Sequence, residues 1–97
     1  EHSAVDTIAD GIAVRVPIPE AVADMDGTVD DALLVRDETM LAGMKLLHQH
    51  LGLVVEPSAA VGVAALLEDP ARFKDQTVAT ILCGANLTRQ QASEWLS

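Results

Sequence analysis

Residues 54–68, with the sequence VVEPSAAVGVAALLE, decide how this chain folds. Pro57 suits the first turn of a helix, and between it and Glu68 every residue except Ser58 and Gly62 is Ala, Val or Leu. A helix that is apolar all round is buried on every side. A chain of 97 residues has little interior for such a helix, because so much of a small domain is surface. The stretch therefore predicts a helix over 57–68 and indicates that further protein surrounds it.

Three segments outside this helix have the pattern of strands. Residues 77–82 form a continuous apolar run rich in β-branched residues, which is typical of a strand covered on both faces of a parallel sheet. Shorter strands are predicted over 31–35 and 53–55. Because strands and helices alternate along the chain, the sequence predicts an α/β fold with a parallel sheet.

The remaining helices are predicted from their ends and their apolar spacing. A helix over 37–51 begins with two acidic residues and ends at Gly52, and its buried stripe consists of Met40, Leu41, Met44, Leu47 and Leu51. A second helix begins after Thr88, which forms a capping box with Gln91. Pro19 predicts a short helix over 19–25, and residues 1–15 are predicted as loop with one helical turn at most.

Composition excludes several functions. The formal net charge of −9 leaves no basic face to replace the counterions of nucleic acid. The longest apolar run, residues 59–67, is half of the roughly 18 residues that a membrane span needs, and the first dozen residues show no signal peptide. A single cysteine, Cys83, excludes an internal disulfide and favours a reducing compartment. We therefore expect a cytoplasmic protein without nucleic-acid or membrane partners.

Three short sequences are candidates for a binding site. Cys83-Gly84-Ala85-Asn86 follows a predicted strand, and in open α/β sheets ligands bind beyond the carboxyl ends of strands; an ordinary loop around a buried free cysteine is the alternative. Glu56 precedes the apolar helix between hydrophobic neighbours, so it is either a buried carboxylate that needs a partner or a solvated capping acid. Gly11, after Asp10, is on local grounds explained better by a simple turn.

Other reactive residues point to no chemistry. His48 and His50 are two residues apart and do not share a helix face, so no metal site is predicted. Lys45 and Lys74 are the two lysines, and both are expected to be solvated surface charges.

Three stretches together resemble one family, the fold-type II pyridoxal-phosphate (PLP) enzymes that include serine dehydratase, threonine dehydratase and serine racemase. These stretches are TIADGIA at 7–13, VVEPSAAVGVAA at 54–65 and ILCGAN at 81–86. Each alone is a weak signal, but their order and separations also agree. The resemblance implies PLP as the cofactor. It further implies that Cys83 hydrogen-bonds the pyridine nitrogen, that Glu56 lies at the edge of the cofactor, and that Gly11 brings backbone close to it.

The chain lacks other parts of that family's pattern. The Schiff-base lysine in its Ser-x-Lys-like motif and the glycine-rich loop for the cofactor phosphate have no counterpart, so no catalytic residue is assigned to this chain. The family's divalent-cation ligands precede the TIADG segment, and no metal ligand is assigned either. Residues 1–97 are therefore expected to be a C-terminal segment of the catalytic region, not a complete catalytic domain. Its expected partners are the N-terminal portion of the same enzyme, a small amino-acid substrate and further copies of the full enzyme in a homo-oligomer.

The resemblance implies an ammonia-lyase that converts L-threonine or L-serine to a 2-oxo acid and ammonia. Two alternatives stay open at this point. One is an amino-acid racemase, such as a serine racemase, on the same scaffold. The other is a non-catalytic interaction module that has kept the fold and lost the chemistry.

Overall fold

The computed structural model describes residues 6–97, so the first five residues of the predicted loop lie outside the described part. Four α-helices follow one another along the chain: α1 (Pro19–Met25), α2 (Asp37–Leu51), α3 (Val61–Glu68) and α4 (Arg89–Leu96). Single 3₁₀ turns lie at η1 (Asp10–Ile12), η2 (Pro57–Ala60) and η3 (Pro70–Phe73). The helices predicted over 19–25 and 37–51 are confirmed at both ends, and Gly52 closes α2 in the left-handed conformation that its position suggested.

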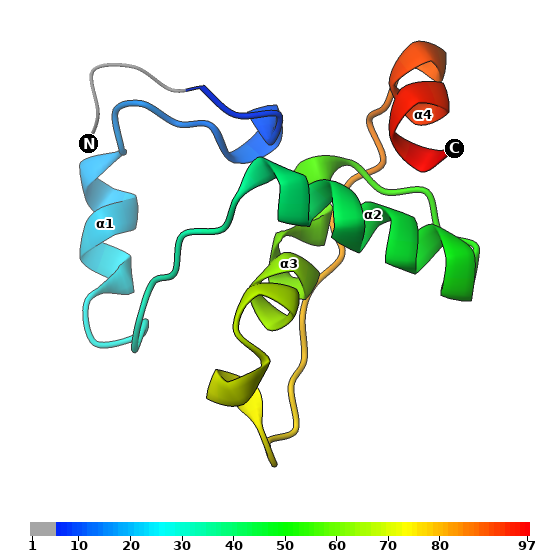
Figure 1. Ribbon diagram of the computed structural model, residues 1–97. Coiled ribbons are helices and arrows are strands. Elements are labelled where there is room, and N and C mark those ends of the chain that lie inside the picture. Colours follow the sequence, from blue (N-terminus) through cyan, green and yellow to red (C-terminus); the bar gives the residue numbers. More distant parts are fainter. Residues whose placement is uncertain (1–5) are drawn as a thin grey trace.

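The core forms where α2 crosses η2 and α3 (Figure 1). The Met44 side chain is fully buried, and Ala60 and Ala64 on the facing segment are buried as completely. Small residues on one helix and unbranched methionines on the other allow this close approach, because methionine fills irregular gaps. The predicted stripe is confirmed at Met40, Met44 and Leu47, whereas Leu51 in the last turn is 64% exposed.

The apolar helix of the opening stretch is only half covered. It begins as the 3₁₀ turn η2, continues as α3, and is buried along the side that faces α2. Val61, Val63 and Leu66 are half-buried and Leu67 is 39% exposed. Part of this helix is therefore left exposed by the described residues, as expected from the small interior of 97 residues, because one neighbouring helix and one extended segment cannot surround it.

The extended segment is residues 77–82, which run along α3 at Gly62. A Cβ atom built on Gly62 would lie 2.8 Å from the Thr80 Cβ, closer than real Cβ atoms approach one another. Gly62 therefore lets this segment lie directly on the helix. This approach holds the downstream Cys83–Asn86 loop near the start of η2.

The predicted parallel sheet is not formed among residues 6–97, where no residue is assigned to a strand. The helices of the predicted α/β fold are thus present in residues 6–97, and its strands are not. A strand needs a neighbouring strand to accept and donate its backbone hydrogen bonds. Residues 53–55 and 77–82 meet only near their ends, where the Glu56 N–H donates to the Gly84 carbonyl oxygen at 3.2 Å. Val55 is buried and Leu82 is half-buried, whereas the other residues of the two segments are exposed, Ile81 to 86%.

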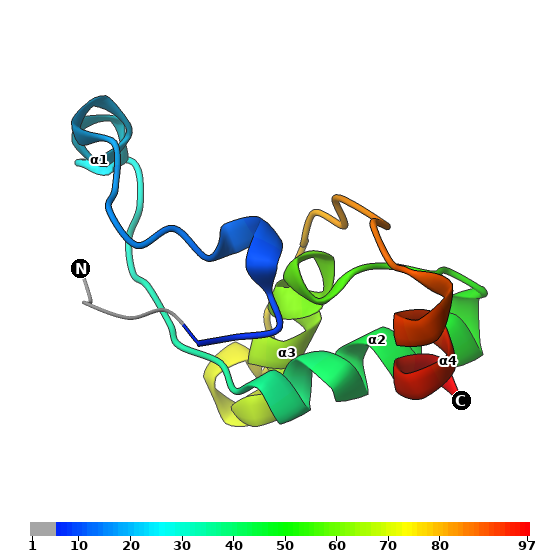
Figure 2. The same ribbon diagram turned by 90° about the horizontal axis from the view of Figure 1, so that it is seen from above.

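Helices α1 and α4 lie on opposite sides of the α2–α3 crossing (Figures 1 and 2). Helix α1 stands apart from the crossing, and none of its residues is buried. Helix α4 packs against α2, and Trp95 and Leu96 contact the core. The predicted capping box of α4 is confirmed by two 3.0 Å hydrogen bonds between Thr88 and Gln91.

The molecule is flat and has a large surface. Its principal extents are 40 × 36 × 19 Å and its radius of gyration is 14.5 Å, against roughly 12.5 Å for a self-contained domain of this length. Its accessible surface is 7334 Å², whereas a folded monomer of 10.2 kDa has about 5300 Å². Within residues 6–97, no helix combines the length and the apolar character of a membrane span.

Candidate functional site

Three segments that are distant in sequence meet at the Glu56 carboxylate. Glu56 is the N-cap of η2, and its side chain lies between Gly11 and Gly84. A Cβ atom on Gly11 would lie 2.8 Å from Glu56 Oε1, and a Cβ atom on Gly84 would lie 2.7 Å from Glu56 Cδ. Both distances are shorter than real Cβ contacts, so the carboxylate occupies the space that a side chain at either position would need. Two of the residues predicted from sequence, Gly11 and Glu56, are thereby brought together.

The loop after Cys83 is fastened to Glu56 by two hydrogen bonds. The Asn86 N–H donates to Glu56 Oε2 at 2.9 Å, and the Glu56 N–H donates to the Gly84 oxygen at 3.2 Å. Gly84 has φ +107°, a conformation that L side chains rarely adopt. This loop is therefore held in one shape by its glycine and by the carboxylate. Glu56 is half-buried and bonded, which agrees with neither a fully buried acid nor a solvated cap.

Ser58 is a polar member of the site that the sequence patterns missed. Its hydroxyl oxygen is buried without a hydrogen-bond partner in the described part of the chain. The same oxygen lies 2.9 Å from the point where a Gly11 Cβ would be, next to Glu56 Oε1. A buried hydroxyl without a partner is unfavourable by about 1–3 kcal/mol, so each such group requires an explanation. The available signal was that Ser58 interrupts an apolar run with a hydroxyl.

Cys83 is exposed, which contradicts the alternative of a buried free cysteine in an ordinary loop. It directly precedes Gly84, so the thiol belongs to the loop that Glu56 fastens. No described contact joins the thiol to the Glu56 carboxylate. The structure therefore gathers Gly11, Glu56, Ser58 and Gly84 at one point and leaves Cys83 open to solvent beside them.

The segment that carries Gly11 is fixed to the beginning of α2. The Thr7 hydroxyl donates to Asp37 Oδ1 at 2.6 Å, and the Ile8 N–H donates to Asp37 Oδ2 at 3.1 Å. The Ala9 N–H donates to the Thr7 hydroxyl at 3.2 Å, and Ala9 is 1% exposed. From this anchor the chain enters η1, which packs against η2 and presents Gly11 to Glu56.

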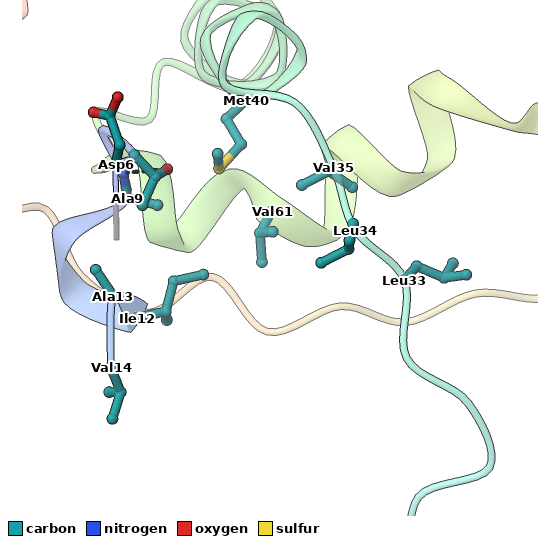
Figure 3. A pocket seen from close by; sticks show the side chains of 11 residues that line it. Asp6, Ala9, Ile12, Ala13, Val14, Leu33, Leu34, Val35, Met40 and Val61 are labelled. Atoms are coloured by element: carbon teal, nitrogen blue, oxygen red, sulfur yellow. Dashed lines mark hydrogen bonds between the residues drawn. The ribbon is translucent and has the colours of Figure 1, made fainter. Parts of the chain in front are cut away.

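An open hollow lies away from this site. It has a volume of about 470 Å³ and lies between η1, residues 33–35 and α3 (Figure 3). Its lining is apolar apart from Asp6 and Thr7, and includes Ile12, Leu34 and Val61. Neither Glu56 nor Cys83 lines it. It offers no convergent polar groups, so we place the candidate site at Glu56.

The remaining reactive residues are dispersed on the surface. Lys45, Lys74, His48 and His50 are all exposed. Among residues 6–97, His, Cys, Asp and Glu side chains form no group of three that could hold a metal ion.

Comparison with known proteins assigns the chain to a family. A family model described as pyridoxal-phosphate dependent enzyme matches residues 1–84. The chain is 33% identical over 82 residues to the beta-hydroxyaspartate dehydratase of Paracoccus denitrificans, an alignment that covers 84% of this chain and 25% of that protein. It is 31% identical over 96 residues to the catabolic L-threonine dehydratase TdcB of Staphylococcus aureus, covering 96% and 28%. It is 32% identical over 81 residues to the L-threo-3-hydroxyaspartate ammonia-lyase of a Pseudomonas species, covering 84% and 25%. The chain thus spans about a quarter of the length of these relatives.

Proposed function

Because the chain belongs to the pyridoxal-phosphate dependent enzymes, we propose that it forms one wall of the cofactor site in an ammonia-lyase for L-threonine or L-serine. The products of that reaction are a 2-oxo acid and ammonia. The convergence of Gly11, Glu56 and Gly84 carries the proposal. Each of these residues belongs to one of the three sequence motifs of the family resemblance. If the turn, the helix cap and the loop had unrelated roles, nothing would require all three to meet at one carboxylate.

The residues at this point fit the cofactor. The absence of side chains at Gly11 and Gly84 lets the Glu56 carboxylate lie directly against both segments, which would hold the three motifs together at the edge of the cofactor. The exposed Cys83 thiol is free to hydrogen-bond a pyridine nitrogen. The buried Ser58 hydroxyl has hydrogen-bonding capacity that the described residues leave unused. The chemistry that PLP supplies when bound is an electron sink at the substrate α-carbon.

Each residue then has a defined task. Cys83 binds the pyridine nitrogen through a neutral group, which holds that nitrogen less firmly protonated than a carboxylate would. Glu56 orients the Cys83–Asn86 loop through the Asn86 N–H and the Gly84 oxygen, and so aims the thiol. Gly11 keeps the opposite side of the carboxylate free of a side chain.

We further propose that residues 1–97 are part of the catalytic region and function with the N-terminal portion of the same enzyme. The excess surface of roughly 2000 Å² supports this, because it exceeds what a self-contained domain of this mass exposes. The lysines also support it. Both are exposed and outside the Glu56 cluster, so the lysine that holds the cofactor has to come from another part of the enzyme.

The names of the relatives support the substrate class. Threonine and 3-hydroxyaspartate are both amino acids with a hydroxyl on the β-carbon, and elimination of that hydroxyl as water is the step that a dehydratase name describes. L-serine shares the feature. Assays should therefore include L-threonine, L-serine and 3-hydroxyaspartate in parallel.

The experiment is reconstitution. The chain is combined with the N-terminal portion of its enzyme and with PLP, and the visible absorption of lysine-bound cofactor is recorded, followed by 2-oxo acid release from each substrate. Folded protein without the absorption band would refute the enzyme and favour the non-catalytic module. The band together with D-amino acid and no 2-oxo acid would identify a racemase.

A further inference from the structure

We propose that Asp37 is a positioning residue for the cofactor site, acting through Thr7 and the segment that carries Gly11. The proposal rests on the function proposed above. Asp37 is the first residue of α2, and in the described structure it accepts hydrogen bonds from residues 7 and 8, outside the Glu56 cluster. Its two carboxylate oxygens are both engaged by the same short segment, Oδ1 by the Thr7 hydroxyl and Oδ2 by the Ile8 N–H.

The geometry of this contact is that of a two-point anchor. A carboxylate that accepts two hydrogen bonds from adjacent residues fixes both the position and the orientation of that segment, and hydrogen bonds to charged groups are the strong ones. The Thr7 hydroxyl also accepts the Ala9 N–H at 3.2 Å, so the anchor continues one residue further toward the site. Ala9 is buried against Met40 and Ala64, which leaves the segment little freedom to shift.

The anchor is two residues from a close contact between Gly11 and the side chains of Glu56 and Ser58. Beyond Ala9, the chain turns through η1 and places Gly11 where a single added carbon would collide with Glu56 Oε1 and with the Ser58 hydroxyl. If Asp37 releases Thr7 and Ile8, Gly11 is free to move away from the carboxylate. Glu56 then loses one of the two glycines between which its side chain lies. The conformation of the Cys83–Asn86 loop, which is hydrogen-bonded to Glu56, is then less well defined.

The chain offers a matched control. Glu38 is the next residue, lies in the same first turn of α2 and is exposed. Both acids favour the positive end of the helix dipole, so removing either has a similar effect on the helix itself. Of the two acids, only Asp37 accepts hydrogen bonds from residues 7 and 8 in the described structure. Comparing Asp37→Ala with Glu38→Ala therefore separates the anchor from the stability of α2.

The experiment uses the complete enzyme and two measurements besides turnover. The first is PLP affinity by titration of the apoenzyme, followed by visible absorption. The second is amide hydrogen exchange of the peptide that covers residues 7–13 in the apoenzyme. Asp37→Ala is expected to weaken PLP binding by about tenfold and to accelerate exchange in this peptide, with Glu38→Ala near wild type in both. Thr7→Val should repeat the effect of Asp37→Ala, and Thr7→Ser, which keeps the hydroxyl, should restore wild-type values.

The outcomes separate the two proposals. A wild-type enzyme that neither binds PLP nor releases 2-oxo acid contradicts the proposed function, whatever the variants do. A functional wild type in which Asp37→Ala matches Glu38→Ala contradicts the anchor alone. Should Asp37→Ala fail to fold, the Thr7 pair decides, because equal PLP affinity in Thr7→Val and Thr7→Ser would also contradict it.

Discussion

At the scale of single residues, the Cys83–Asn86 loop depends on contacts that the sequence could only partly predict. The sequence identified Cys83, Glu56 and Gly11 by their positions in motifs, and the structure brings two of these together. The hydrogen bond from Asn86 to Glu56 joins residues that are 30 positions apart. The buried Ser58 hydroxyl lies inside an apolar run. Local patterns carry no information on such pairs, because the patterns describe neighbours along the chain.

Cys83→Ser tests the residue assigned to the cofactor's pyridine nitrogen. A serine hydroxyl replaces the thiol with another neutral hydrogen-bonding group, so the complete enzyme should still bind PLP, with a change in kcat of no more than about tenfold. The reason is that one such hydrogen bond contributes about 0.5–1.5 kcal/mol net. Cys83→Ala, which removes the group, is the comparison. Absorption and steady-state kinetics measure both, and complete loss of cofactor in the serine variant would contradict the assignment.

At the scale of elements, helix ends were predictable and strands were not. Proline, glycine and the Thr88–Gln91 capping box act within a few residues of themselves, and both ends of α1 and α2 and the beginning of α4 follow from them. A strand is stabilised by a partner that no local pattern specifies. Residues 77–82 have the apolar, β-branched composition of a buried strand, yet in the described chain they lie on α3 as an extended segment.

Gly62→Ala tests this extended segment. The added methyl group collides with Thr80, so the segment has to move away from α3, and overpacking of this kind is destabilising by about 1–3 kcal/mol. The melting temperature of the complete enzyme should fall accordingly. Thr80→Gly removes the atoms that the methyl group meets. The double variant should therefore lose less stability than the sum of the two single variants, and strict additivity would show that the two residues do not touch.

Glu68 connects the end of α3 to the beginning of α2 and gives a pH-dependent contribution. Its Oε1 atom accepts hydrogen bonds from the Arg36 N–H at 2.8 Å, the Arg36 Nε–H at 3.1 Å and the Thr39 hydroxyl at 2.7 Å. The Arg36 backbone N–H, and then the Thr39 hydroxyl, lower the pKa of Glu68 below its ordinary value of 4.5. A lowered pKa in the folded state stabilises the fold above pH 4.5, and this contribution is lost as the pH falls through the folded pKa.

Glu68→Gln should therefore remove one acid-sensitive component of stability. We expect the melting temperature of the wild type to fall more steeply than that of the variant below about pH 4.5. Above that pH the difference between the two should be constant. Glu38→Gln, at an exposed acid, should follow the wild-type curve. Parallel curves for the wild type and Glu68→Gln across the acid range would mean that Glu68 titrates as an ordinary surface carboxylate.

At the scale of the whole molecule, the chain has one helical layer and an apolar surface that the layer does not cover. Leu34 is 96% exposed and Ile81 is 86% exposed, both in segments whose sequences predict strands. Domains are built from two or more packed layers, and this chain is 19 Å thick in its thinnest direction. The apolar helix of residues 57–68 is half covered for the same reason.

The chain alone should therefore bind hydrophobic dyes and self-associate. We expect anilinonaphthalene sulfonate fluorescence to increase on addition of the isolated chain, and sedimentation to depend on concentration. Both effects should decrease when the N-terminal portion of the enzyme is added, if that portion covers the same surface as we propose. Ile81→Lys should reduce dye binding, with Lys74→Ala, at a polar exposed site, as the control. A monomeric chain that binds no dye would indicate that its apolar residues are already covered.

The close approach of the Glu56 carboxylate and the Ser58 hydroxyl to Gly11 also constrains the order in which these three positions can change over evolutionary time. Alanine at position 11 requires Glu56 Oε1 and the Ser58 hydroxyl to move aside. Shortening Glu56 first removes the nearer of these two atoms, whereas the reverse order passes through an intermediate in which the carboxylate has to move. Glutamate at 56 should accordingly be lost before glycine at 11 wherever the cofactor is no longer needed.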